Sequence, residues 1–197
     1  RFTWRGLFSP AAPETLTALD AWARGKSDVT LASGKDALTF IAARNDEASL
    51  TVMRERAFRD ELVAWMRLSP SHPAYASDGL NLDALRMGRL EGAVAGKILA
   101  SPLFSLADRL GLAKSLVSEA AKTMTATACL IFHRPAGESP VETGRAFYRF
   151  WLEFTRFGLA GWPMAVLADV PAAAQAMGRR FSVPAAHRLI NVLRVGP

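Results

Sequence analysis

The sequence is poor in the residues that build disulfide scaffolds and metal sites. Its 197 residues include a single cysteine, Cys129, and only three histidines. One cysteine cannot form a disulfide within the chain, which excludes a small secreted scaffold held by disulfides. Cys129 stands in the apolar run ATACLIF and is expected to be a small buried side chain. His72, His133 and His187 show no metal-ligand spacing, so no metal site is predicted.

Common catalytic motifs are also missing. The sequence contains no G-x-S-x-G, no P-loop and no G-x-G-x-x-G. Asp60 and Glu61 lie beside arginines and are expected to form surface pairs. Glu138 and Glu142 flank the start of a predicted helix, where carboxylates favour the positive end of the helix dipole. Because no catalytic side chain is predicted, an enzymatic activity would need a cofactor for its chemistry.

Long apolar runs and a signal-peptide pattern are absent too. The apolar segments at residues 92–112 and 158–177 are interrupted by charged residues and prolines. Neither is a run of about 20 apolar residues, as a membrane span requires. The start, RFTWRG, does not resemble a secretory signal. A cytoplasmic protein without membrane association is therefore expected.

Positive charge is in modest excess. The chain has 24 basic and 18 acidic residues, a formal net charge of +6. The basic residues are scattered, whereas a nucleic-acid-binding protein typically carries a concentrated basic stripe. The charge therefore favours a small anionic ligand and argues against nucleic acid as the partner.

The apolar periodicity predicts a mainly helical protein with a few strands. Helices are expected at residues 13–24, 35–46, 48–68, 82–96, 103–123, 141–157 and 171–180, and strands at residues 28–33, 125–133 and 188–196. Strands separated by helices, with helices in excess, predict an α+β fold arranged as a layered α/β/α sandwich around a small central sheet. The length fits a single domain over residues 1–197.

The opening segment, RFTWRGLF, alternates polar and aromatic side chains. If it is extended, Arg1, Thr3 and Arg5 share one side and Phe2 and Trp4 the other. Two guanidinium groups and a hydroxyl on one side suit a phosphate or a carboxylate. A solvated basic edge strand with an apolar back is the alternative that these residues leave open.

Three segments resemble the flavin-dependent nitroreductase family. RFTWRGLF is similar to that family's R-x-[ST]-x-R-x-F opening. GRAFYRFWLEFTRFGLAGWPMAVLAD resembles its G-x-A-x-x-x-x-x-L-x-x-x-x-x-G-L helix and the proline-containing loop that follows. RLINVLRVGP looks like its last core strand. The three segments stand in the family's order, and the resemblance implies the nitroreductase-like form of the layered fold.

The chain departs from the family pattern in two places. The P-S-x-x-N-x-Q-P-W motif is absent, and residues 50–120 match no family motif. This arrangement resembles the second half of a subgroup in which two nitroreductase-like halves share one longer chain. The resemblance therefore implies either a homodimer or packing against a missing N-terminal half.

The resemblance implies FMN as the cofactor, held at an interface between two halves or subunits. Carried over by position, Arg1, Thr3 and Arg5 would contact the FMN phosphate. Arg194, on the closing strand, would reach the same anion or pair with a surface acid.

The helix predicted at residues 141–157 carries an aromatic stripe at helical spacing and is called the aromatic helix below; the stripe comprises Phe147, Phe150, Trp151, Phe154 and Phe157. A second part of the implied FMN site follows this helix. Pro163, Met164, Ala165 and Val166 would lie along the isoalloxazine ring. A tight connection between a core helix and a strand is a compatible alternative for this segment.

The activity implied by the resemblance is hydride transfer from NAD(P)H through the flavin to a nitroaromatic, a quinone or a similar acceptor. A flavin-binding or storage protein with little turnover is the main alternative, favoured by the missing motif. A third hypothesis is an interaction module that uses the wide apolar face of residues 82–123 to bind a partner or a membrane surface.

Overall fold

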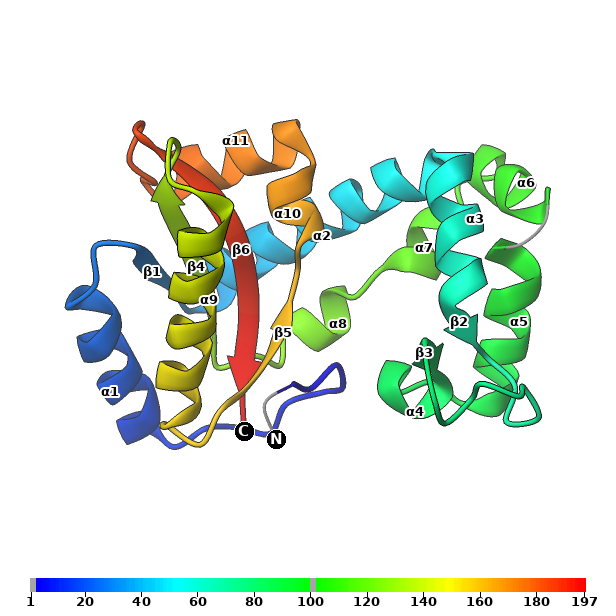
Figure 1. Ribbon diagram of the computed structural model, residues 1–197, viewed down its shortest axis with the longest axis horizontal. Coiled ribbons are helices and arrows are strands. Elements are labelled where there is room, and N and C mark those ends of the chain that lie inside the picture. Colours follow the sequence, from blue (N-terminus) through cyan, green and yellow to red (C-terminus); the bar gives the residue numbers. More distant parts are fainter. Residues whose placement is uncertain (1–2, 100–101) are drawn as a thin grey trace. The chain divides into compact units, whose positions relative to one another are not determined.

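The computed structural model describes residues 3–99 and 102–197 and contains two compact units. Unit 1 joins the residues up to Ala48 to Glu119–Pro197, and unit 2 comprises Ser49–Ser118. The first boundary falls inside one continuous helix, α2 (Lys35–Arg54). Figure 1 shows the elements of both units along the chain.

Unit 1 is built on a four-stranded antiparallel sheet. Its strands are β1 (Val29–Ala32), β4 (Ala128–Pro135), β6 (His187–Gly196) and β5 (Ala160–Pro163), in that spatial order. Each strand pairs antiparallel with its neighbour. The two long strands, β4 and β6, lie in the centre, and the two short strands form the edges (Figure 1).

Helices cover both faces of this sheet. Besides α2 they are α1 (Pro13–Arg24), α8 (Ala120–Thr123), α9 (Pro140–Thr155), α10 (Val166–Asp169) and α11 (Pro171–Arg180). Leu19 of α1 and Phe154 of α9 pack in one buried cluster with Leu130 of β4. Ile41 of α2 packs in a second cluster with Ile131, the next residue of β4, and with α10 and α11. Because neighbouring residues of a strand point to opposite faces, the sheet separates two apolar layers.

The aromatic helix is α9, and its start is encoded locally. Ser139 caps it, since the side-chain oxygen accepts a hydrogen bond from the Glu142 backbone N–H at 3.3 Å. Pro140 occupies the first helical position, where its missing N–H costs nothing. Phe150 stacks on Phe132 of β4 with ring centres 4.8 Å apart. The aromatic stripe thus anchors α9 to the sheet, as its spacing predicts.

Unit 2 is mainly helical. It comprises the end of α2, α3 (Arg56–Trp65), β2 (Met66–Arg67), β3 (Leu80–Asn81), α4 (Leu82–Leu85), α5 (Arg89–Leu99), α6 (Leu103–Arg109) and α7 (Ala113–Val117). Its buried core is small and centres on Met53, Phe104 and Ala113. Arg54 and Asp108 form a two-pronged ion pair with both N–O distances at 2.9 Å.

Unit 2 also exposes several large apolar side chains. Leu90, Leu110 and Leu112 are 80%, 65% and 56% exposed, respectively. In the described parts of the chain, none of the helices is by itself long and apolar enough to cross a bilayer. Among the described helices, α5 and α6 are the one pair that together reaches the required length and hydropathy, and they are bent by 89°. The hypothesis of an interaction surface within residues 82–123 stays a prediction.

The expected fold class is confirmed: the protein is α+β, with helices in excess and a small central sheet. Several helix predictions were wrong in extent. The helix expected over residues 82–96 is divided into α4 and α5 at Arg86, whose φ is +52°. The break expected near residue 47 lies instead at Glu55, whose backbone is extended. The helix expected over residues 103–123 is three short helices, interrupted at Gly111, with φ +73°, and at Ser118. The sequence patterns did not predict β5 and α10.

Candidate functional site

The N-terminal segment lies against the edge of the sheet in unit 1. Thr3 forms a parallel bridge with Gly161 of β5, and the Trp4 backbone N–H donates to the Gly161 carbonyl at 3.1 Å. The Arg5 guanidinium carbon lies 5.7 Å from the centre of the Trp162 ring. The opening motif is thus joined to the strand that follows the aromatic helix, although more than 150 residues separate them in sequence.

Only part of the predicted phosphate-binding triplet falls within the described residues. Arg1, and Phe2 beside it, lie outside them. Thr3 is exposed, and Trp4 and Arg5 are partly buried. The Trp4 indole N–H donates to the Leu7 carbonyl at 2.8 Å, which holds the segment in a tight turn.

Arg194 of β6 meets this segment from inside the unit. Its side chain is 0% exposed, and one terminal nitrogen donates to the Arg5 backbone carbonyl at 3.0 Å. The other terminal nitrogen donates to Thr123 Oγ1 at 3.3 Å. Its Nε is buried without a hydrogen-bond partner. Burial lowers the pKa of Arg194, and the neighbouring carboxylate of Glu119 opposes that shift. The structure therefore brings the predicted residues Arg5 and Arg194 together.

Glu119, which the sequence patterns did not single out, lies between the two arginines. Its carboxylate is 2.7 Å from the Arg5 guanidinium, 2.8 Å from that of Arg194 and 3.3 Å from the Lys122 ammonium. Its backbone N–H donates to Asp46 Oδ1 at 3.0 Å. Burial works against ionisation, but the three cations hold the pKa of Glu119 below its usual range. The only sequence signal was the Glu119–Lys122 spacing of three residues, which is common on helices.

The predicted ring-binding segment forms the connection between β5 and α10. Pro163 ends β5, and Met164 is buried, with its backbone N–H donating to a carbonyl of β6 at 2.7 Å. Ala165 is the exposed N-cap of α10, and Val166 is the first helical residue and partly buried. The segment is therefore a tight connection from a strand to a short helix, whereas the alternative expected one between the core helix and a strand.

Thr123 links this connection to the arginines. Its hydroxyl accepts from Arg194 and lies 3.9 Å from the Met164 sulfur. Thr123 is itself fully buried at the end of α8. The arginine pair and the β5–α10 connection are thus two sides of one contiguous region of unit 1.

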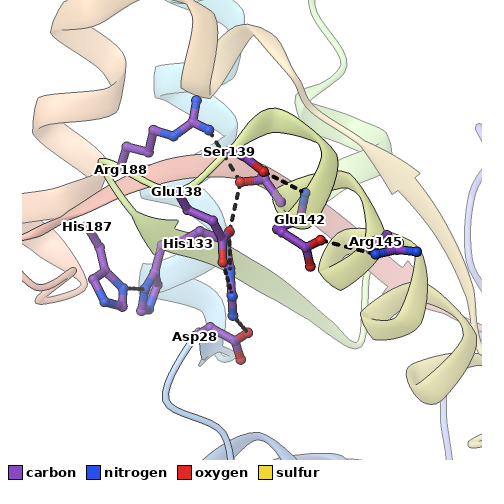
Figure 2. Close-up of polar contacts among 10 residues, drawn as sticks. Asp28, His133, Glu138, Ser139, Glu142, Arg145, His187 and Arg188 are labelled. Carbon is purple, nitrogen blue, oxygen red and sulfur yellow. Dashed lines mark hydrogen bonds and ion pairs between the residues drawn. The ribbon is translucent and has the colours of Figure 1, made fainter.

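A second polar cluster ties the far ends of β4 and β6 together (Figure 2). His133 Nδ1 and His187 Nδ1 are 2.8 Å apart, a hydrogen bond in which one ring donates and the other accepts. His133 is 3% exposed, and its backbone N–H donates to the Asp28 carbonyl at 3.0 Å. Burial, and then the neighbouring His187, lower the pKa of His133. The sequence separates the histidines by 54 positions, and only the strand pairing unites them.

Arg134 is the centre of the same cluster. It donates to Asp28 Oδ2 at 2.7 Å and forms a two-pronged pair with Glu138. The Thr143 hydroxyl donates to Glu138 at 2.8 Å and accepts from Arg188 at 3.3 Å. The hydrogen bonds from Arg134 are the main cause that lowers the pKa of Glu138 to about 2. Glu138 thus fastens α9 to β4, a role beyond the helix-dipole contact expected from its position.

An open hollow of about 810 Å³ lies between the α1–β1 connection and α9. Trp22, Lys26, Arg149 and Glu153 are among the residues that line it. Glu153 is engaged there by Lys26 at 2.6 Å and by the Trp22 indole N–H at 3.0 Å. Of the assigned cofactor residues that the structure describes, none lines this hollow.

Comparison with known proteins places the chain beside one group of solved structures. The FMN-dependent nitroreductase of Mycobacterium smegmatis in complex with NADPH matches with a TM-score of 0.49 and 18% identity, over 100% of this chain and 83% of that one. A nitroreductase of Bacteroides fragilis with bound FMN matches with a TM-score of 0.45 and 15% identity, over 100% and 83%.

A nitroreductase-like protein of Bacillus cereus also matches, with a TM-score of 0.41 and 12% identity, over 100% of this chain and 80% of that one. No family model matches the sequence, and no curated protein is significantly similar to it. Because each TM-score is below 0.5 and each identity below 20%, these similarities assign neither cofactor nor activity to the chain.

Proposed function

We propose that the chain is an FMN-dependent oxidoreductase of the nitroreductase type. It would transfer hydride from NAD(P)H through the flavin to a nitroaromatic, a quinone or a similar acceptor. The observation that supports this most is the convergence of the three motif segments. The opening segment bridges β5 at Gly161, and Arg194 of the closing strand donates to the Arg5 carbonyl at 3.0 Å.

The residues at this convergence suit the phosphate group of FMN. Arg5 and Arg194 present guanidinium donors, and Thr3 offers an exposed hydroxyl on the same segment as Arg5. The buried Nε of Arg194 has no hydrogen-bond partner, so the region holds a donor that an anion would satisfy. We assign the phosphate to Thr3, Arg5 and Arg194, with Arg1 as a further donor.

The isoalloxazine ring is assigned to the connection of residues 163–166 between β5 and α10. Thr123 joins this connection to Arg194 through its contacts with both. The bound flavin would supply the hydride chemistry, and the chain would bind and orient it. We further propose that the protein works in the cytoplasm, with the ring covered by a second copy or by an N-terminal half.

The direct test is FMN binding by the purified protein. We expect a yellow protein, or a colourless one that quenches the fluorescence of added FMN. Changing both Arg1 and Arg5 to Ala should weaken FMN binding at least about 150-fold, because two charge-assisted hydrogen bonds are lost and each is worth about 1.5–3 kcal/mol. Arg24→Ala, which removes an exposed arginine paired with Asp20 on α1, is the control and should leave binding unchanged. Equal FMN affinity in all three proteins would contradict the phosphate assignment.

One observation favours a second candidate, a flavin-binding protein with little turnover. Glu119 already engages both Arg5 and Arg194, which would weaken the hold on a phosphate. Anaerobic addition of NADPH or NADH to the FMN-loaded protein separates the two functions. Bleaching of the yellow colour within seconds to minutes supports the oxidoreductase, whereas a stable yellow colour supports the carrier.

A further inference from the structure

The Glu119 carboxylate is bound in the way that a phosphate would be bound. Its Oε1 accepts a hydrogen bond from Arg5 Nε at 2.7 Å and lies 2.7 Å from a terminal nitrogen of the same guanidinium. The same oxygen accepts a hydrogen bond from Lys122 Nζ at 3.3 Å. Its Oε2 forms an ion pair with a terminal nitrogen of Arg194 at 2.8 Å. The side chain is only 13% exposed, so these contacts are partly shielded from water and salt.

Among the described contacts, the Glu119 side chain interacts only with these three cations. It is the N-cap residue of α8, yet its side chain makes no capping hydrogen bond. Its backbone is held separately, through the N–H that donates to Asp46 Oδ1. The carboxylate is therefore committed to the cations alone, and its replacement would leave the local backbone contact in place.

The charges around it leave room for an anion. Arg5, Arg194 and Lys122 all contact the Glu119 carboxylate, so three cationic side chains meet one carboxylate in these described contacts. Arg194 is 0% exposed and retains an unpartnered Nε, so its hydrogen-bonding capacity is not exhausted by Glu119. A buried guanidinium with a free donor is a costly arrangement unless a further acceptor is bound.

We propose that Glu119 determines how strongly, and how selectively, this site holds the phosphate of FMN. A carboxylate and a phosphate accept hydrogen bonds from the same guanidinium donors, so the phosphate must displace Glu119 from Arg5 and Arg194 or share them with it. The affinity for the phosphate is thereby lowered, and the flavin ring carries a larger share of the binding. This inference rests on the proposed function.

The test is the change in flavin affinity on Glu119→Gln, measured with two probes. FMN carries the phosphate, and riboflavin is the same ring system without it. Glutamine keeps the size and one acceptor oxygen but removes the competing charge. We expect Glu119→Gln to bind FMN at least about tenfold more tightly than the unaltered protein, which corresponds to about one lost competing contact. Its affinity for riboflavin should stay within about twofold.

Glu142→Gln is the matched control. It removes an exposed carboxylate paired with Arg145 at 3.1 Å on α9, and it should change neither affinity. Glu119→Asp is the second variant. It is needed if Glu119→Gln, which removes the negative charge beside the buried Arg194, fails to fold. Aspartate keeps the charge but is one methylene shorter, so it cannot reach both arginines as Glu119 does. It should gain FMN affinity to a smaller extent.

The outcomes separate this inference from the proposed function. If the unaltered protein binds FMN and neither variant binds it more tightly, the inference about Glu119 is wrong and the cofactor assignment stands. An equal gain for FMN and riboflavin also contradicts the inference, because the effect would not involve the phosphate. If no variant binds any flavin, the proposed function fails. Inorganic phosphate, followed by 31P NMR, then decides the anion site, with tighter binding by Glu119→Gln as the supporting result and no difference as the contradicting one.

Discussion

At the scale of single residues, the pair of His133 and His187 makes the stability of unit 1 depend on pH. The 2.8 Å contact between their Nδ1 atoms requires one ring to accept, so it is lost when both rings are protonated. The groups around the pair are Asp28, Arg134 and Arg188, and Arg134 disfavours a further positive charge. The pKa of His133 is therefore lowered in the folded protein, first by burial and then by His187.

The sign of the pH effect follows from this direction. An unfolded histidine has a pKa of about 6.5, so below that pH the unfolded chain binds a proton that folded His133 does not. Stability should fall as the pH drops from about 6.5, by up to about 1.4 kcal/mol per pH unit for each extra proton. We expect His187→Asn to reduce this slope between pH 6.5 and 5.5 in urea unfolding. His72→Asn, on an exposed loop, should not.

The pH range over which the histidine pair affects stability differs from the range over which the carboxylates do. Glu138, held near a pKa of about 2 chiefly by Arg134, loses its contribution only as the pH falls well below 5. An unchanged slope in His187→Asn between pH 6.5 and 5.5 would show that the pair does not control the acid sensitivity.

At the scale of elements, the edge strand β5 depends on a glycine. A side chain at Gly161 would place its Cβ 2.8 Å from the Phe154 ring of α9 and 3.3 Å from Leu193 of β6. The carbonyl of Gly161 also holds the Trp4 N–H. Only a residue without a side chain lets α9, β6 and the N-terminal segment approach this strand together.

This packing predicts opposite effects for two glycine substitutions. Gly161→Ala should destabilise the protein by about 1–3 kcal/mol, because the added carbon overpacks the contact with Phe154. Gly144→Ala, within α9, meets no atom within 4 Å and should stabilise it by about 0.5–1 kcal/mol through helix propensity. Denaturant midpoints of both variants check this. A Gly161→Ala protein as stable as the original would refute the packing argument.

At the scale of the whole molecule, the two units share one continuous helix. The α2 helix runs from Lys35 to Arg54 through the boundary after Ala48, and unit 1 is assembled from two separate stretches of chain. We propose that the chain unfolds as a single domain. Helix formation is cooperative, so loss of α2 in one unit destabilises the part of the same helix that belongs to the other unit.

Tryptophan fluorescence can test this proposal unit by unit. Trp65 is the one tryptophan in the sequence of unit 2, and the other four belong to unit 1. Fluorescence of a Trp65→Phe variant therefore reports unit 1 alone, while far-ultraviolet circular dichroism reports helices of both. We expect the two urea transitions to coincide within about 0.2 M in midpoint, as two-state unfolding requires. Two resolved transitions would contradict a single cooperative domain.

Much of the fold could be predicted because local patterns encode it. Proline at the first turn predicted α1 and α9, and the apolar run of β4 predicted a buried strand. The strand β5 escaped prediction because its sequence, AGWP, contains a glycine and a proline, which are uncommon in strands. The helix α10 escaped because its four residues are too few for a helical period to appear. The long helices of the middle segment were overestimated because their apolar pattern continues across Glu55 and Gly111, where the backbone is not helical.

The sequence by itself determined the fold class, the aromatic helix and the chemistry of the arginines in the opening and closing segments, because these depend on residue type and on spacing within one element. Only the tertiary structure decided that Arg5 and Arg194 share the carboxylate of Glu119, and that His133 meets His187. Such contacts arise from strand pairing and layer packing between distant segments. No local pattern records them, since the distance between two side chains is set by how the sheet and its helices close around the core.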